Sequence, residues 1–493
     1  MDQSRAPYFQ ALLDYVDAGV IPFHTPGHKQ GIGMDRAFRE FVGDNIASID
    51  LTPMPGIDDL LQPKESILEA QRLAAEAYGA DRTHFLINGS TSGNQCMLMA
   101  ALDPGDKVAV PRNSHKSLLG SLVMSGARPI YMQPEVDEAL HMDHTVTPAT
   151  VERTLDEHSD IRAVYIVSPT YYGVAADLDR IFEIVHARGK LVLVDEAWGP
   201  HFHFHPDLPR SATAAGADLC VNSTHKMLSS FSQSSMLHQI GERVRIDRLD
   251  AVLKLFLSTS PNLPMVASLD VARRQMAMQG EALLSDTIAL AQRTRALINE
   301  IPGVYCFGEE LVGRAGVFDF DPTKVTITVK DLGYTGYEAS AILRGRYNVQ
   351  VELADLFNVV ALFTIGTTQA AADRLVFGVK ELAREDRPVD IFSPSGVLER
   401  RLKTGTYKLP KIPPLRMPPR EAFLAATEPV RFKSSQGRIC AEVITPYPPG
   451  IPVIAPGEEI TAEIIDYLDL ELRAGVHMQG PFDPQLKRIR VVK

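Results

Sequence analysis

The sequence predicts an α/β protein whose main domain is a mostly parallel sheet with helices on both faces. Short apolar runs alternate with helical stretches between residues 63 and 300, as expected when helices cross between parallel strands. Beyond residue 300 the order changes to that of a smaller α+β domain. The length of 493 residues also exceeds what one hydrophobic core normally holds together, so several domains are expected.

Changes in composition suggest where the domains begin and end. A Pro-rich run, Leu409 to Pro419, is typical of a stiff connector and predicts a boundary. The expected division is an N-terminal segment 1–62, a large domain 63–300, a small domain 301–408, a linker 409–420 and a C-terminal domain 421–493.

The charge balance argues against some partners. Fifty basic and 61 acidic residues give a formal net charge of −11, and no basic block offers a surface for nucleic acid. A negative field favours a small cationic substrate. No leader-like or membrane-spanning apolar run is visible, so we expect a soluble cytoplasmic protein. Four scattered cysteines indicate buried, reduced thiols, and we expect no metal site.

The first 62 residues contain little regular structure apart from a short amphipathic stretch, 8–16. The loop Phe23 to Gly31 is rich in Gly, Pro and His, and its histidines can face a ligand or belong to a plain turn. A second irregular stretch, Asp50 to Gly56, could lie on a neighbouring subunit. A helix is then expected over 64–78, ending at Gly79.

An anion-binding site is predicted where the next strand ends. A strand over 83–87 breaks into a small polar loop, 88–94, before a helix over 95–102. A helix N-terminus offers unpaired backbone N–H groups, to which Ser90 and Thr91 add hydroxyl donors. The ordinary alternative is simple helix capping.

The alternation continues with strands over 107–110 and 163–167 and a helix over 178–187. His115 follows the first of these strands and could lie flat against a planar ring, or be an ordinary loop histidine. Further helices are expected over 250–301, with a break at 261–264. The small domain should contain strands 324–329, 349–353 and 359–364 and helices 336–343 and 370–383, and a last strand should cover 489–492.

The stretch from Leu191 to Lys226 carries the clearest chemical signal. A buried strand, 191–194, ends at Asp195, and the apolar run 219–221 leads to Lys226. Carboxyl ends of parallel strands share one edge of a sheet, where ligands bind. A lysine that forms an imine and an acid that pairs with a ring nitrogen are what pyridoxal phosphate requires. The alternative is an unrelated surface acid and surface amine.

Motifs spread over the whole chain resemble one family. They are HTPGHKQG, NGSTSGN, PRNSHKS, SPTYYGV, VDEAWGPHF, STHK, YPPGIP and QGP, in this order. This combination resembles the ornithine/lysine/arginine decarboxylases of the pyridoxal-phosphate, aspartate-aminotransferase-like type (fold type I), particularly the short bacterial arginine decarboxylases. The resemblance implies pyridoxal 5'-phosphate as cofactor, bound by the large domain.

The resemblance also assigns roles to individual residues. Lys226 resembles the Schiff-base lysine and Asp195 the partner of the pyridine nitrogen, while His115 matches a histidine that stacks on the ring. His225 resembles a residue near the reacting carbon and is a candidate proton donor. The remaining cofactor-binding candidates are Ser90, Thr91 and Ser223 for the phosphate and Trp198 at a position occupied by Trp or His in relatives.

The implied activity is decarboxylation of a basic amino acid, arginine first, giving agmatine and CO2 as in polyamine biosynthesis. Lysine or ornithine as substrate, an aminotransferase, and a non-catalytic protein of the same fold remain alternatives. Three acids are candidates to bind the cationic end of the substrate: Glu352, Asp355 and Glu458. The alternative for each is that it is a solvated surface acid. We expect a homodimer or higher homo-oligomer with interfacial active sites.

Overall fold

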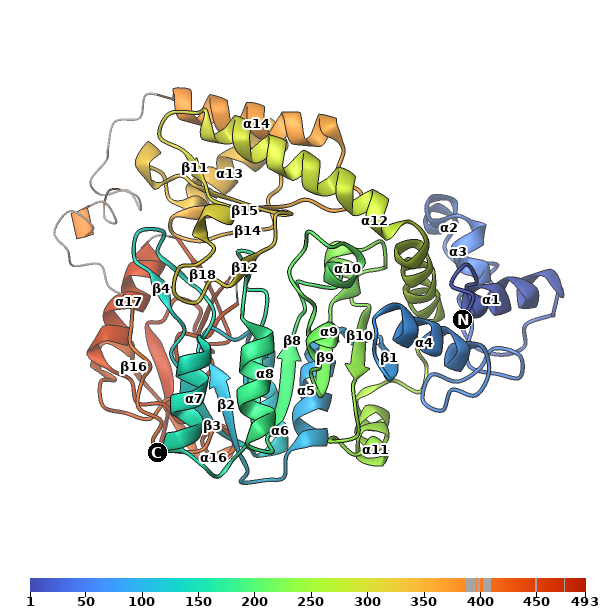
Figure 1. Ribbon diagram of the computed structural model, residues 1–493, viewed down its shortest axis with the longest axis horizontal. Coiled ribbons are helices and arrows are strands. Elements are labelled where there is room, and N and C mark those ends of the chain that lie inside the picture. The colour runs from blue at the N-terminus through green and yellow to red at the C-terminus, as the bar shows by residue number, and fades with distance from the viewer. Residues whose placement is uncertain (386–395, 397–399, 402–408, 448–449, 474) are drawn as a thin grey trace. The chain divides into compact units, whose positions relative to one another are not determined.

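The computed structural model describes residues 1–385, 396, 400–401, 409–447, 450–473 and 475–493. Figure 1 shows the chain. It forms two compact units, the first made of residues 1–101 and 191–285 and the second of residues 102–190 and 286–493. The predicted end of the small domain at residue 408 lies outside the described residues, as do Pro448 and Pro449 of the YPPGIP motif. The expected domain boundaries therefore stay a prediction.

The first unit is built on four buried strands. β8 (Leu191–Asp195) and β9 (Leu219–Asn222) run parallel, while β10 (Ser235–Gln239) is antiparallel to both β9 and β1 (Arg82–Leu86). Helix α11 (Ile246–Phe256) packs against α5 (Gly89–Ala101), and α5 contacts the strands. The strands lie in the order β1, β10, β9 and β8.

The N-terminal segment is anchored to this unit by a buried ion pair. Asp270 accepts a hydrogen bond from the backbone N–H of Tyr8, and it is itself paired with the fully buried Arg273 at 2.7 Å. Helix α1 (Pro7–Asp17) therefore begins where its first N–H groups meet a carboxylate, a favourable position at a helix N-terminus. The other helices of this unit are α2 (Arg36–Val42), α3 (Asp44–Ser48), α4 (Ser66–Ala77), α9 (Ala212–Ala215), α10 (Thr224–Met227) and the first part of α12 (Leu263–Asn299).

The second unit contains three parallel strands in the order β6 (Ile161–Val167), β2 (Lys107–Pro111) and β3 (Arg128–Met132). Helices α7 (Pro148–Glu157) and α8 (Leu178–Ala187) lie in front of these strands in Figure 1. Asp177 caps α8 by accepting a hydrogen bond from the N–H of Arg180, which explains why the helix begins at Leu178 as predicted. Helix α6 (Ser117–Ser125) packs against α16 (Pro419–Leu424).

A four-stranded antiparallel sheet forms the small-domain part of the second unit. Its order is β11 (Tyr305–Cys306), β13 (Lys324–Thr328), β15 (Asn358–Leu362) and β14 (Leu353–Ala354). Helices α13 (Gly336–Tyr347) and α14 (Gln369–Arg384) pack on it around Leu343 and Val379. The predicted strand 349–353 is wrong for residues 349–352, because within this stretch only Leu353 pairs with β15, in a ladder that continues to Ala354.

The C-terminal part has its own core, which includes Ile444, Ile454, Leu468 and Ile489. Helix α17 (Ala462–Arg473) supplies Leu468 to it. Strand β16 (Thr427–Arg431) pairs with β19 (Arg488–Val492), and β17 (Thr445–Tyr447) pairs with β18 (His477–Gln479). The remaining described strands are short: β4 (Val136–Asp137), β5 (Met142–Asp143), β7 (Val174–Ala175) and β12 (Asp319–Phe320). Single 3-10 turns lie at Phe202–Phe204, Glu309–Leu311, Lys330–Leu332 and Phe432–Ser434.

The predicted fold class is confirmed: parallel strand pairs predominate in the part covered by residues 102–222, and an antiparallel α+β part and a C-terminal part follow. All four cysteines are free and buried, as the sequence indicated. Among the described helices, none is both long enough and apolar enough to cross a bilayer.

Candidate active site

Two parallel strands deliver the main candidate residues to one edge of the first unit. β8 is buried along its length and ends at Asp195, which is paired in register with Val221 of β9. β9 ends at Asn222, and α10 follows at once with His225 and Lys226 in its single turn. Because parallel strands end at the same edge, the acid and the amine lie at one edge of the sheet, and their sharing of one site stays a prediction.

Asp195 is held by donors from two directions. Its Oδ2 accepts a hydrogen bond of 2.9 Å from Nδ2 of Asn94, and its Oδ1 accepts one of 3.1 Å from the backbone N–H of Ala197. The side chain is 5% exposed, so its orientation is set by the protein rather than by water. A carboxylate fixed in this way is suited to bind a cationic N–H group of a ligand through a charge-assisted hydrogen bond.

Helix α5 approaches the strands closely enough to place Asn94 beside Asp195. A Cβ atom at Gly93 would lie 2.4 Å from Cγ2 of Val221 and 2.9 Å from Cδ1 of Leu86, so only glycine permits this contact. The helix begins at Gly89, six residues before the predicted start at Gln95. The prediction of a loop over 88–94 is thus wrong for residues 89–94, because packing of α5 against β1 and β9 overrides the low helix propensity of Gly and Ser.

Three serine hydroxyls converge at the start of α5. Oγ of Ser90 lies 2.6 Å from Oγ of Ser223 and 3.1 Å from Oγ of Ser235. These groups adjoin the positive end of a 13-residue helix, which favours an anion. Thr91, in the same turn, is exposed. Thr224 is fully buried, and its Oγ1 has no hydrogen-bond partner among the described residues.

Lys226 lies on the face of an aromatic ring. Its Nζ is 3.8 Å from the centroid of the Trp198 ring, a cation–π distance. Its neighbour His225 is oriented by a hydrogen bond of 2.7 Å between Nδ1 and the carbonyl oxygen of Ser234. A carbonyl oxygen can only accept, so Nδ1 of His225 carries the proton of that bond.

The next residue after Asp195 is a buried acid that links the two strand ends. Glu196 accepts hydrogen bonds from the backbone N–H of Ala212 and from Nδ2 of Asn222, at 2.6 and 2.9 Å. Burial raises its pKa to about 7. Glu196 therefore ties β8 to β9 and to the start of α9, and this is a supporting role that the sequence did not indicate.

His115 lies in the second unit, at the end of β2. Its Nδ1 accepts a hydrogen bond from the backbone N–H of Ser117 at 3.2 Å and lies 2.9 Å from Oγ of that residue. The loop histidines of the N-terminal segment have partners nearby: Nε2 of His24 is 2.8 Å from the Tyr15 hydroxyl, and Nε2 of His28 is 3.0 Å from Asp50. The stacking role of His115 stays a prediction.

The three acids proposed to bind the substrate side chain differ in their surroundings. Glu352 is exposed, as a surface acid would be. Glu458 is fully buried and paired with Arg112 at 3.0 Å, and Asp355 accepts a hydrogen bond of 2.7 Å from the Tyr172 hydroxyl. The interpretation of Glu458 and Asp355 as solvated surface acids is wrong, because each is held by partners inside the second unit.

The residues of the first unit fit pyridoxal phosphate. The serine hydroxyls and the N-terminus of α5 match a phosphate, Asp195 with its two donors matches a protonated ring nitrogen, and Lys226 supplies the amine. An acid, an amine and hydroxyl groups at a strand edge of an α/β sheet are the groups that a pyridoxal-phosphate site requires.

The family assignment follows from the sequence. Residues 6–371 match the model of the Orn/Lys/Arg decarboxylase major domain and residues 403–489 that of its C-terminal domain. The chain belongs to the Orn/Lys/Arg decarboxylase family, which confirms the family and the carboxy-lyase class predicted from its motifs.

Individual relatives match over the full length. An arginine decarboxylase of Bacillus subtilis is 44% identical over 493 residues, covering 100% of this chain and 99% of the relative, and one of Bacillus anthracis is 43% identical, covering 100% and 98%. The solved structure of the Escherichia coli constitutive lysine decarboxylase superposes with a TM-score of 0.84 at 23% identity, covering 100% of this chain and 82% of that one, which supports the fold.

Sequence reasoning gave no individual role to Asn94, Ser235 or the carbonyl of Ser234. Asn94 closes the NGSTSGN motif, and an amide one turn into a buried helix is a usable signal for a side chain that faces a strand end. The two serines come from the segment that begins β10, and the antiparallel pairing of β10 with β1 and β9 brings them to Ser90 and His225.

Proposed function

We propose that the protein is a pyridoxal-phosphate-dependent decarboxylase of a basic L-amino acid, converting L-arginine to agmatine and CO2. The observation that carries the proposal is the convergence of the Lys226 amine, the oriented Asp195 carboxylate and the serine hydroxyls at one sheet edge. Full-length identity of 43–44% to arginine decarboxylases supports arginine as substrate.

The chain's own residues would hold the cofactor by distinct groups. Lys226 would bind it through Nζ, and Asp195 would pair with the ring nitrogen while Asn94 keeps the carboxylate in place. Ser90, Thr91 and Ser223 would hold the phosphate at the start of α5, and His115 would stack on the ring. Pyridoxal phosphate, when bound, supplies an electron sink for the electrons of the breaking Cα–carboxylate bond.

Each turnover replaces the carboxylate on Cα by a proton. His225 is the candidate to deliver it, with Lys226 as the alternative donor. Because the Ser234 carbonyl holds a proton on Nδ1 of His225, the change of protonation falls on Nε2. Trp198 keeps the Lys226 amine at the site through its ring face, where Lys226 would hold the cofactor whenever no substrate amine is bound.

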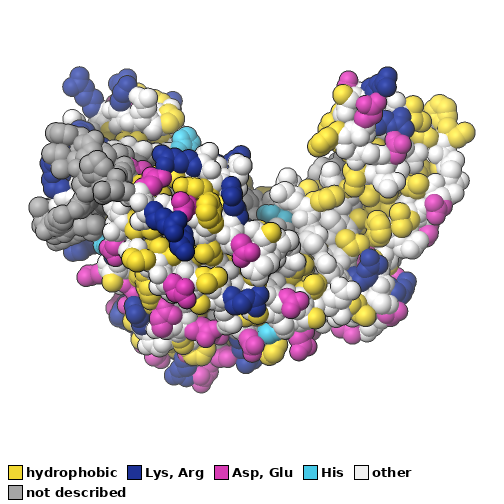
Figure 2. Space-filling view, turned by 90° about the horizontal axis from the view of Figure 1, so that it is seen from above, with side chains coloured by type: hydrophobic (Ala, Val, Ile, Leu, Met, Phe, Trp, Pro, Cys, Tyr) yellow, Lys and Arg dark blue, Asp and Glu magenta, His cyan; other side chains and the backbone are white. Residues whose placement is uncertain are grey.

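The proposal includes a homodimer or larger homo-oligomer with active sites at the interface. Large hydrophobic side chains of the N-terminal segment are exposed, among them Phe23 at 93% and Phe41 at 90%. Figure 2 shows hydrophobic side chains gathered at the right, where this segment lies. Apolar surface of this kind is typical of a protein interface. A cytoplasmic location belongs to the same proposal.

The test is the product profile of the full-length protein loaded with pyridoxal phosphate and incubated separately with arginine, lysine and ornithine. We expect agmatine and CO2 in equal amounts from arginine and little product from the others. Release from lysine or ornithine alone would keep the reaction and overturn the substrate. A keto acid without CO2, formed when an acceptor is added, would overturn the reaction in favour of amino transfer.

A further inference from the structure

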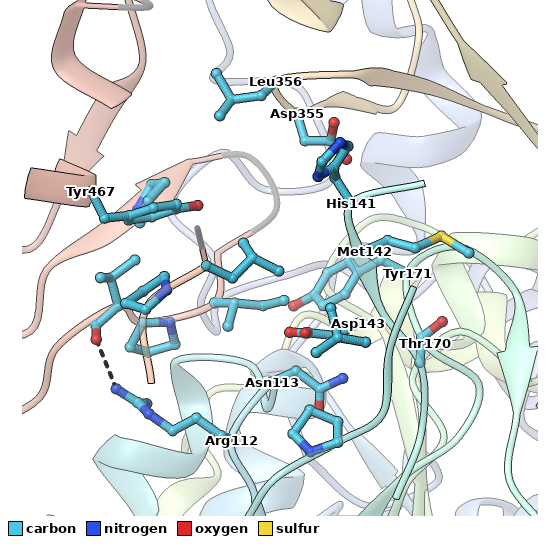
Figure 3. A pocket seen from close by; sticks show the side chains of 18 of the residues that line it. Arg112, Asn113, His141, Met142, Asp143, Thr170, Tyr171, Asp355, Leu356 and Tyr467 are labelled. Carbon is cyan, nitrogen blue, oxygen red and sulfur yellow. Dashed lines mark hydrogen bonds between the residues drawn. The ribbon is translucent and has the colours of Figure 1, made fainter. Parts of the chain in front are cut away.

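A cavity of about 170 Å³ lies inside the second unit. Its walls come from the end of β2, from β5, from the loop after β6, from the Asp355 loop and from α17. Figure 3 shows Asp143, Asp355 and Tyr467 around this space, with Arg112 below it. Glu471, one turn after Tyr467 on α17, also lines the cavity. The cavity therefore combines carboxylates from separate elements.

Glu471 is a buried carboxyl group whose hydrogen bonding is incomplete. It is 2% exposed, and Oε2 has no hydrogen-bond partner among the described residues. The carboxyl group does receive a hydrogen bond from Tyr467. Buried polar atoms without partners are uncommon in folded proteins and require an explanation, such as a bound ligand.

Asp143, on β5, is a second carboxylate at the cavity and is half-buried. It lines the cavity, and across the described part of the chain nothing donates a hydrogen bond to its carboxylate. Asp355, by contrast, is held by the Tyr172 hydroxyl and by the backbone N–H groups of Phe357 and Asn358. Two carboxyl groups, Asp143 and Glu471, thus retain oxygen atoms able to accept hydrogen bonds from a ligand.

Burial dominates the pKa values of these acids, and it outweighs the nearby Arg112 charge, which lowers the pKa of Asp143. Burial raises the pKa of Glu471 to about 8, with the Asp355 charge as a second cause, and burial raises the pKa of Asp143 to about 6. Burial also raises the pKa of Asp355. Desolvated acids of this kind hold a proton unless a positive charge approaches them.

The three basic side chains that line the cavity, Arg112, His141 and Lys411, are in different states. Arg112 donates to the Val453 carbonyl oxygen and to Glu458, and Lys411 is exposed. His141 stacks on Phe357, and burial lowers its pKa to about 4, so its imidazole is uncharged at neutral pH. Four tyrosines, Tyr171, Tyr172, Tyr337 and Tyr467, also line the space, and aromatic walls suit cations and their carbon chains.

We propose that this cavity binds an organic cation, a guanidinium or ammonium group on a short carbon chain, through Asp143 and Glu471. A molecule with this chemistry has two possible sources: the side-chain end of an amino acid undergoing reaction, and a free amine bound separately. The first source rests on the proposed function, whereas the second does not.

The binding test compares two ligands of nearly equal shape. The full-length protein is titrated calorimetrically with butylguanidine, a cation, and separately with butylurea, its neutral counterpart, and the two affinities are compared. We expect butylguanidine to bind at least about tenfold more tightly, the size of one charge-assisted hydrogen bond. Equal affinity of the two ligands, or no binding of butylguanidine, would overturn the proposal.

Two variants assign the binding to this cavity. Glu471→Gln and Asp143→Asn keep the side-chain shape but remove a negative charge, and each should weaken butylguanidine binding about tenfold. The control is Glu463→Gln, at an exposed position on the same helix, which should leave the affinity unchanged. Unchanged affinity in both cavity variants, with their unfolding temperatures preserved, would contradict the proposal.

Proton release gives a second readout that loss of folding cannot imitate. A cation that pairs with Glu471 displaces its proton, so titrations in buffers of different ionisation enthalpy should differ near pH 7. The affinity should rise with pH from about 6 to about 8, where the acids ionise. Glu471→Gln should reduce both effects, and identical heats in both buffers for the wild type would overturn the proposal.

Kinetics separate the two sources. If the cavity takes the substrate's side chain, Glu471→Gln should raise KM for arginine and the inhibition constant of butylguanidine in parallel, with competitive inhibition. If it takes a separate amine, inhibition should not be competitive and KM should stay unchanged. If butylguanidine binding depends on Glu471 but the protein releases no CO2, the cavity site is supported and the proposed function is rejected. If the protein releases CO2 but shows no such binding, the proposed function is supported and the cavity site is rejected.

Discussion

The side-chain amide of Asn94 donates a hydrogen bond of 2.9 Å to Asp195, so a residue of helix α5 orients the carboxylate that ends strand β8. This contact depends on the close packing of α5 at Gly93. Asp195 belongs to strand β8, but a residue of helix α5 positions its carboxylate.

Replacing Asn94 by Ala should lower kcat about tenfold, because a hydrogen bond to a charged group contributes ~1.5–3 kcal/mol. As a positioning residue, Asn94 should affect kcat more than the KM for arginine. Asn45→Ala, at an exposed site, is the control. Steady-state kinetics with arginine would check this, and a change confined to KM would argue against the positioning role.

Replacing Ser90 by Ala should weaken the binding of pyridoxal phosphate but not that of pyridoxal, which lacks the phosphate. Ser90 lies between Ser223 and Ser235 at the helix start, where an anion is favoured. A loss of about fivefold to tenfold in affinity corresponds to one hydrogen bond. Fluorescence titration of cofactor-free protein with both compounds measures it. Equal losses for the two would place the serine hydroxyls away from the phosphate.

His225→Gln tests the proton donor. Loss of a general acid should lower kcat about a hundredfold or more. The variant should also lose the part of the kcat–pH profile that reports the titration of Nε2. Retention of near-normal turnover and pH profile would assign the proton to another group, with Lys226 the first alternative.

The stability of the protein should fall as the pH rises through about 8. Burial raises the pKa of Glu471 to about 8, whereas an exposed glutamate titrates near pH ~4.3. Between these pH values the folded state holds a proton on Glu471 that the unfolded state has released. The contribution of Glu471 to the free energy of unfolding is therefore complete at low pH and is lost as the pH rises. Thermal unfolding of Glu471→Gln should be less sensitive to pH over this range than that of the wild type or of Glu463→Gln. An unaltered pH dependence would mean that Glu471 titrates normally.

Much of the site's framework could be predicted because it depends on local patterns. The apolar run before Asp195 and the one before Lys226 were sufficient to place both at one sheet edge, and α8 begins and ends at the predicted residues. Family motifs added roles that no local pattern contains, such as that of His115, and these stay predictions.

Contacts between distant segments could not be predicted. The helix α5 begins at Gly89 because it packs against β1 and β9, and nothing in the composition of NGSTSGN indicates that packing. The bonds from Asn94 to Asp195 and from His225 to Ser234 also require the folded sheet. The expected strand over 349–352 has the right β-branched residues but no ladder partner.

The most direct test of the account follows the labelled carboxyl carbon of arginine. Full-length protein loaded with pyridoxal phosphate is incubated with arginine carrying 13C at that carbon, and labelled CO2 and agmatine are quantified together. We predict equal amounts from the wild type and from Lys254→Ala, at an exposed position, and no product above background from Lys226→Ala. Absence of labelled CO2 from the wild type, or undiminished release by Lys226→Ala, would contradict the assignment of the reaction to this site.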